Sequence, residues 1–147
     1  TAMQRGGQAL VGTHDFISFQ SAGSDRESTV RSIFAVEVAA NGAGQGHIAP
    51  PSWRDAQKSD SAASPMKLRD SRQDGGAIYE RDALVTSDVE GDGFLYNMVR
   101  AIAGTLVEVG RGRRRPESIA ETIAAADRSA AGQTAPPHGL SLLWVAY

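Results

Sequence analysis

The feature that most constrains the fold is a stretch of 42 residues, 41–82, that carries few large apolar side chains. Its large apolar residues are Ile48, Trp53, Met66, Leu68, Ile78 and Tyr79. Glycines and prolines interrupt it, and its six basic side chains are balanced by six acidic ones. Such a segment cannot bury enough apolar surface to offset the conformational entropy that ordering removes. We therefore expect a flexible surface insertion, which leaves 105 of the 147 residues for a single domain.

The overall composition excludes several classes of protein. The chain has no cysteine, which rules out disulfide scaffolds, thiolate zinc sites and cysteine nucleophiles. Its formal net charge of −2 argues against nucleic-acid binding through bulk charge but is compatible with a local basic patch. No apolar run approaches the roughly 18 residues that span a bilayer, and the N-terminal residues carry no secretion signal. We therefore expect a cytoplasmic protein that does not interact with a membrane.

The remaining residues show clear periodicity. Apolar residues at three- and four-residue steps predict helices, and alternation or a short continuous apolar run predicts strands. The predicted elements, in the order helix, strand, strand, helix, helix and strand, are residues 2–11, 30–38, 83–90, 94–109, 116–127 and 140–147. Strands and helices mix without a regular βαβ alternation, so the expected fold is α+β, with a mixed, largely antiparallel sheet packed against helices.

Two of the predicted strands carry specific expectations. In the strand 30–38, strict alternation places Phe34, Val36 and Val38 on one face and Ile33 on the other. The segment 140–147 is apolar on both faces, which is typical of a strand in the centre of a sheet.

Arg100 is the first candidate for a functional residue. It lies in the predicted helix 94–109 among residues whose spacing places them in the core. An arginine beside such a face either extends its guanidinium to solvent or pairs with an acid. The first alternative is structural, whereas the second would hold a carboxylate charged and oriented.

A cluster of arginines follows this helix directly. Arg111, Arg113, Arg114 and Arg115 occupy four of five consecutive positions between two predicted helices. Guanidinium groups suit phosphate oxygens, so the cluster is a candidate RNA-binding patch. The alternative is a solvated loop whose side chains bind the carbonyl groups at the end of the helix.

Other candidates are weaker. His14 and Asp15 are adjacent, but without a nucleophile motif they are expected to cap a helix end or form a turn. The glycine-rich run 42–46 lacks the spacing of a dinucleotide-binding loop. His14, His47 and His138 lack the spacing of metal ligands, so no metal site is expected.

Four motifs resemble one family, in the same order along the chain. They read LVGTHDF at 10–16, GFLYNMVR at 93–100, GTLVEVGRG at 104–112, and DR followed by TAPPHGL within 127–140. Together they resemble the tRNA pseudouridine synthase A family, and the match covers nearly the whole chain outside 41–82. The resemblance implies a pseudouridine-synthase-like fold and indicates that this chain is the C-terminal portion of such an enzyme.

The resemblance also implies the chemistry. Enzymes of this family break the bond between a uridine base and its ribose in the anticodon arm of tRNA, rotate the base and rejoin it through carbon. They use an aspartate, need no cofactor and work as homodimers. By resemblance, Arg100 is the partner of the catalytic aspartate, and Leu140 is an apolar residue that lines the uracil pocket. A carboxylate in a pocket that excludes water needs a fixed counter-charge to stay ionised, which agrees with this role of Arg100.

The sequence departs from the family pattern in ways that limit this expectation. The motif that carries the aspartate, which resembles GRTDxGVHA, does not occur in the chain, and neither does the RxYxY segment that supplies an active-site tyrosine. Gln20, Ala101 and Gln133 stand where an arginine, an asparagine and a proline are common. Asp92 is not expected to replace the aspartate, because eight residues, or roughly 12 Å along a helix axis, separate it from Arg100.

We therefore expect this chain alone to be inactive, with the half that carries the aspartate absent. Two alternatives remain open from the residues. The chain is a non-catalytic RNA-binding or dimerisation fragment, or it is an α+β domain that has kept the fold and lost the function.

Overall fold

The structure, a computed structural model, describes residues 1–23, 27–40 and 85–147. The predicted insertion at 41–82 lies outside these residues, so its flexibility stays a prediction. Among the described helices, none has the length and apolar content needed to cross a membrane.

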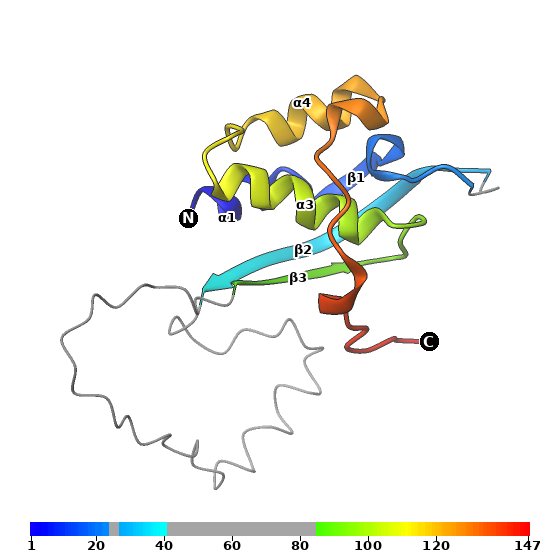
Figure 1. Ribbon diagram of the computed structural model, residues 1–147. Coiled ribbons are helices and arrows are strands. Elements are labelled where there is room, and N and C mark those ends of the chain that lie inside the picture. Colours follow the sequence, from blue (N-terminus) through cyan, green and yellow to red (C-terminus); the bar gives the residue numbers. More distant parts are fainter. Residues whose placement is uncertain (24–26, 41–84) are drawn as a thin grey trace, which may run out of the picture. The chain divides into compact units, whose positions relative to one another are not determined.

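Three helices and a three-stranded sheet make up the described part of the chain (Figure 1). The elements are α1 (Ala2–Gln8), β1 (Gly12–Asp15), β2 (Val30–Ala40), β3 (Val85–Gly91), α3 (Met98–Gly110) and α4 (Ser118–Ala125). Three 3₁₀ turns, η1 (Ile17–Phe19), η2 (Arg128–Ala130) and η3 (Pro137–Gly139), complete them. Both strand pairs are antiparallel, in the order β1-β2-β3. The α+β class predicted from the sequence is therefore confirmed.

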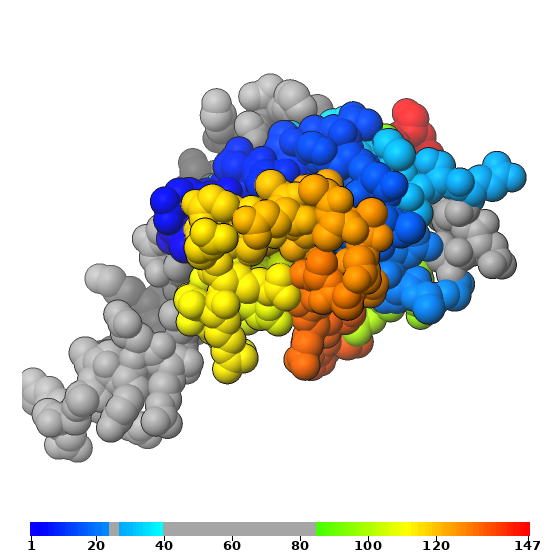
Figure 2. Space-filling model, turned by 90° about the horizontal axis from the view of Figure 1, so that it is seen from above, coloured from blue at the N-terminus to red at the C-terminus, as the bar shows by residue number. Residues whose placement is uncertain are grey.

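The helices gather on one face of the sheet (Figure 1). Helix α1 contacts both β2 and α3, while α4 contacts α1 and the turn η1. Seen from above, α4 and the orange segment that follows it lie beside the blue N-terminal part (Figure 2). One core joins these elements: Leu10, Phe16, Phe19, Ile33, Val36, Leu95, Met98, Ala101, Ile102, Leu106, Val109, Ile119 and Ala131.

The predicted alternation of β2 is wrong at its centre. Ile33 and Val36 are both buried on the helix side, whereas Phe34 is 58% exposed. The cause is a register shift between Ile33 and Ala35, where β2 advances two residues while β3 advances one. Such a β-bulge reverses the parity of the strand, so that residues on its two sides no longer alternate as a regular strand requires.

The predicted strand at 140–147 is also wrong, since none of these residues pairs with a described strand. Leu140, Leu142, Leu143 and Val145 are about half exposed or more. An apolar run becomes a central strand only where neighbouring strands accept its backbone hydrogen bonds, and residues 140–147 pair with none of the described strands.

Helix α3 begins four residues later than predicted, and the strand β1 was missed. Asn97 precedes α3 with φ = 58°, a left-handed conformation that asparagine tolerates better than most residues, and this turn separates Phe94 from the helix. Strand β1 has only four residues, too few for alternation to be recognised.

Candidate functional site

Arg100 lies in the first turn of α3, half-buried, and neutral oxygens hold its guanidinium. Its Nε donates a hydrogen bond to the carbonyl of Ala135 at 2.7 Å, and Nη1 donates to Oδ1 of Asn97 at 2.8 Å. The Asn97 amide in turn donates to Oγ of Ser21 at 3.2 Å. Among the described residues, no carboxylate forms an ion pair with Arg100. Three of its five N–H groups therefore remain available for an acceptor from elsewhere.

The carbonyl that binds Arg100 belongs to a segment we call the strap, residues 131–135. The strap runs from the end of η2 across α3 (Figure 1, orange). The N–H of Ala135 donates to the carbonyl of Arg100 at 3.0 Å, and the N–H of Gly132 donates to Oγ1 of Thr105 at 2.9 Å. The strap therefore shares its backbone hydrogen bonds with the same helix that carries Arg100.

The approach of the strap to α3 requires a glycine. A Cβ added at Gly104 would lie 1.7 Å from the carbonyl oxygen of Gln133. Real Cβ contacts essentially never fall below 3.0 Å, so no other residue fits here without displacing the strap. A glycine inside a helix lowers stability by about 1 kcal/mol relative to alanine. The close approach of the strap explains why residue 104 is nevertheless a glycine.

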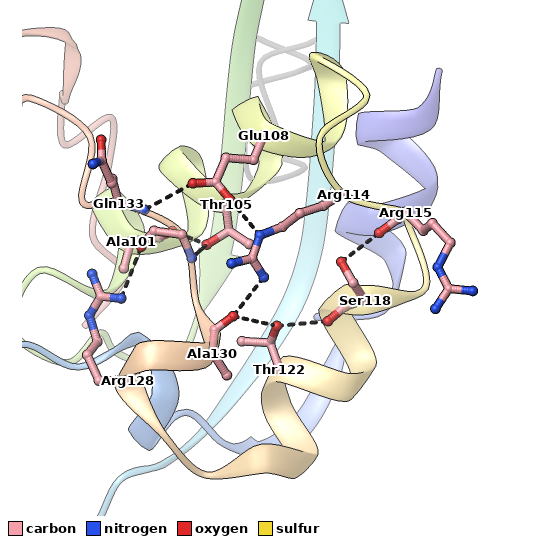
Figure 3. A network of polar contacts seen from close by, with 11 residues as sticks. Ala101, Thr105, Glu108, Arg114, Arg115, Ser118, Thr122, Arg128, Ala130 and Gln133 are labelled. Atoms are coloured by element: carbon pink, nitrogen blue, oxygen red, sulfur yellow. Dashed lines mark hydrogen bonds and ion pairs between the residues drawn. The ribbon is translucent and has the colours of Figure 1, made fainter.

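The arginine cluster divides into engaged and free members. Arg114 forms an ion pair with Glu108, and its Nη1 donates to the carbonyl of Ala130 at 2.7 Å (Figure 3). The side chain of Arg115 points away from this network (Figure 3). It reaches Glu121 at 3.4 Å, in a pair whose side chains are largely exposed.

The other two members of the cluster are free. Arg111 and Arg113 are exposed, and no described residue accepts a hydrogen bond or forms an ion pair with either guanidinium. The prediction that all four arginines bind RNA stays a prediction. The geometry nevertheless leaves Arg111 and Arg113 as the pair with all guanidinium N–H groups available.

The other predicted residues form their described hydrogen bonds with other partners than Arg100. Leu140 follows η3, 52% exposed, and its N–H donates to the carbonyl of Pro137 at 3.0 Å. Asp15 caps a turn, as expected, because its Oδ1 accepts from the N–H of Ile17 at 3.1 Å. Asp92 binds the backbone N–H of Ser32 at 3.0 Å, a structural contact.

A family model described as tRNA pseudouridine synthase matches residues 7–147. The chain belongs to this family.

Individual relatives agree with the family match. A tRNA pseudouridine synthase A from Halalkalibacterium halodurans is 40% identical over 139 residues, which cover 95% of this chain and 38% of the relative. The enzymes of the same name from Syntrophotalea carbinolica and Bacillus pumilus are 36% and 37% identical, over 99% and 94% of this chain and 42% and 40% of their own lengths. The chain thus spans about two fifths of the length of the curated relatives it matches.

Within this member of the family, sequence reasoning missed the residues that hold the strap. Glu108, Arg128 and Thr105 contact it through side chains, and Asn97 fixes the guanidinium of Arg100. One signal was available, because an isolated glycine inside a strongly helical pattern, such as Gly104, often marks a close approach by another segment. The identity of that segment is not encoded locally, since the strap lies about thirty residues further along the chain.

Proposed function

We propose that this chain is part of a tRNA pseudouridine synthase, an isomerase that converts uridine to pseudouridine in the anticodon arm of tRNA. The observation that carries the proposal is Arg100. It is half-buried, oriented by two neutral oxygens, and retains free N–H groups in a chain that belongs to this family.

The role proposed for Arg100 is to pair with the carboxylate of the catalytic aspartate. A guanidinium offers parallel N–H groups that match the two oxygens of a carboxylate, and the pair is stronger where water is excluded. The charge also favours the ionised form of the aspartate, which the reaction requires. The contacts to Ala135 and Asn97 engage Nε and Nη1, and because both acceptors are neutral they hold the direction of the guanidinium without neutralising it.

The proposed contacts to substrate involve two further parts of the chain. Leu140, which is half exposed, would form part of the wall of the uracil pocket. Arg111 and Arg113 would bind phosphates of the tRNA, because their guanidinium groups are free in the described structure. The enzyme would act without a cofactor, as a homodimer in the cytoplasm.

A second candidate function is favoured by the same free arginines. A chain without the aspartate motif but with an exposed basic loop would bind RNA without modifying it. The two candidate functions differ in what a substitution of Arg100 would change. In the synthase it would lower turnover, whereas in the RNA-binding protein it would affect only packing.

The test is pseudouridine formation, measured by tritium release from labelled tRNA. We expect no turnover from the 147-residue chain alone. In an enzyme that combines this chain with the aspartate motif, Arg100→Ala should nearly abolish turnover and leave tRNA affinity within a few-fold. Arg5→Ala is the control, because it removes an exposed arginine of α1 to which neither a catalytic nor an RNA-binding role is assigned. Normal turnover by the Arg100 variant would contradict the proposal.

A further inference from the structure

We propose that Glu108 and Arg114 are positioning residues for Arg100, and that they act through the strap. The inference rests on the proposed function of Arg100 and adds two residues that the family chemistry does not use directly. It begins from the polar network between α3, the loop after it and the strap (Figure 3).

The first step is the ion pair between Glu108 and Arg114. Oε2 of Glu108 accepts from Nε of Arg114, and Nη1 of the same guanidinium donates to the carbonyl of Ala130. Ala130 directly precedes the strap. One planar guanidinium therefore links the last turns of α3 to the start of the strap, and its rigid fork fixes the distance between them.

The pair is shielded, which distinguishes it from an ordinary surface contact. The side chains of Arg114 and Glu108 are 27% and 25% exposed, whereas those of the Arg115–Glu121 pair are 77% and 64% exposed. Solvent screens exposed pairs until they contribute little, while a shielded pair with additional hydrogen bonds retains more of its interaction. The carboxylate of the second pair, Glu121, is therefore a natural control for Glu108.

The second step is the attachment of the strap along α3. Thr105 is fully buried; its hydroxyl donates to the carbonyl of Ala101 at 2.7 Å and accepts from the N–H of Gly132. Glu108 adds a longer contact, at 3.4 Å, from the N–H of Gln133 to Oε1. Together these bonds hold the strap along one face of the helix.

The outer side of the strap is held as well. Arg128 donates from Nη1 to the carbonyl of Gly132 at 3.0 Å and from Nη2 to Oγ1 of Thr134 at 2.9 Å. The strap therefore has side-chain contacts on both sides, and little freedom to shift along α3.

The third step connects the strap to the candidate site. Ala135 exchanges two hydrogen bonds with Arg100, since its N–H donates to the backbone carbonyl and its carbonyl accepts from Nε. A shift of the strap must therefore rotate the guanidinium or break the Nε bond. A catalytic group displaced by about 1 Å can lower the rate about 10²-fold. The Glu108–Arg114 pair, about two helix turns from Arg100 along α3, can therefore affect turnover.

The experiment compares Glu108→Gln and Arg114→Lys with the control variants Glu121→Gln and Arg5→Lys, since Arg5 is an exposed arginine of α1 to which no role is assigned. In the enzyme that includes the aspartate motif, we expect both test variants to lower kcat about tenfold or more. The KM for tRNA should not change, because the guanidinium of Arg114 is engaged by Glu108 and Ala130, and the phosphate contacts are proposed for Arg111 and Arg113. The control variants should match the wild type in both constants.

A second measurement reports on Arg100 itself. In the 147-residue chain, hydrogen exchange of the Arg100 Nε–H, followed by ¹H–¹⁵N NMR, should accelerate in Glu108→Gln and Arg114→Lys and not in the controls. A variant that was merely less stable would accelerate exchange throughout the core as well, so the amides of Ile102 and Leu106 serve as internal references. Arg114→Lys keeps the positive charge but removes the planar guanidinium that bridges Glu108 and Ala130. It therefore tests the positioning role even if Glu108→Gln does not fold.

The outcomes separate this inference from the proposed function. Unchanged exchange at Arg100 in Arg114→Lys would overturn the positioning role, and so would a kcat equal to that of the controls in an enzyme that Arg100→Ala inactivates. If exchange accelerates but Arg100→Ala retains normal turnover, the strap does position the side chain and the proposed function fails.

Discussion

Replacing Gly104 with alanine is the sharpest test of the contact between the strap and α3. In an ordinary helix this change would stabilise the protein by about 1 kcal/mol, because alanine has the higher helix propensity. Here the new Cβ would lie 1.7 Å from the Gln133 oxygen and 2.9 Å from its carbonyl carbon. The obstacle is backbone, so a rotamer change cannot relieve it, and the strap has to retreat by more than 1 Å to reach a 3.0 Å contact.

That displacement has a calculable consequence. Three hydrogen bonds of 2.7 to 3.0 Å join the strap backbone to Arg100 and Thr105, and a retreat of this size lengthens them beyond bonding distance. At about 0.5–1.5 kcal/mol each, their loss outweighs the gain in helix propensity. We expect the free energy of unfolding to fall by about 1–3 kcal/mol in Gly104→Ala, and Tm to fall by roughly 5–20 °C.

Thermal unfolding followed by circular dichroism measures the effect. Gly110→Ala in the same helix is the control, because the atoms that its Cβ would meet belong to the adaptable side chain of Met3. Its Tm should stay close to that of the wild type. A Tm of Gly104→Ala equal to or above the wild-type value would refute the close packing of the strap on α3.

Further predictions concern other parts of the chain. Replacing Arg111 and Arg113 with glutamine should flatten the slope of log affinity for tRNA against log salt by about 1.8, at about 0.9 for each phosphate contact, and an unchanged slope would mean that neither binds a phosphate. Hydrogen bonds from the Ser129 hydroxyl and backbone N–H hold the pKa of the Asp127 carboxyl below its ordinary value, so Ser129→Ala should raise that pKa in an NMR titration. A pKa lowered in the folded state stabilises the protein above the unfolded-state pKa, and this stabilisation is lost as pH falls through the folded-state pKa; a titration identical to that of the wild type would contradict the assignment. Deleting residues 41–82 and closing the gap with a short turn should leave Tm within about 10 °C of the wild-type value, because loop length enters the closure entropy only logarithmically.

The sequence predicted those parts of the fold that local patterns determine. The apolar spacing of α3 identified its buried face, including Met98, Ile102, Leu106 and Val109. The bulge in β2 was not predictable, because an extra residue opposite β3 depends on the pairing of two strands and leaves no mark in the alternation of one. The segment 140–147 illustrates the same limit, since a strand needs a partner as well as a pattern.

The candidate site was predictable only in part. The composition of the helix singled out Arg100, but its acceptors, Asn97 and Ala135, are set by a left-handed turn and by a segment that returns from far along the chain. The arginine run was read as one cluster, whereas tertiary contacts divide it. Arg114 pairs with Glu108 and also binds the carbonyl of Ala130, whereas none of the described residues pairs with the guanidinium of Arg111.

The use of backbone atoms at Ala135 has a consequence for mutational mapping of the site. Its acceptor is a main-chain carbonyl, so every amino acid at this position supplies it equally. An alanine scan passes over the contact altogether, since the residue is already alanine, and a library of side-chain substitutions samples only the bulk of the new side chain. A change to the main chain itself exposes this pairing, because proline at 135 deletes the N–H that donates to the carbonyl of Arg100. Proline apart, a map of tolerated substitutions would therefore show no sensitive position at Ala135, although its carbonyl holds the guanidinium of Arg100.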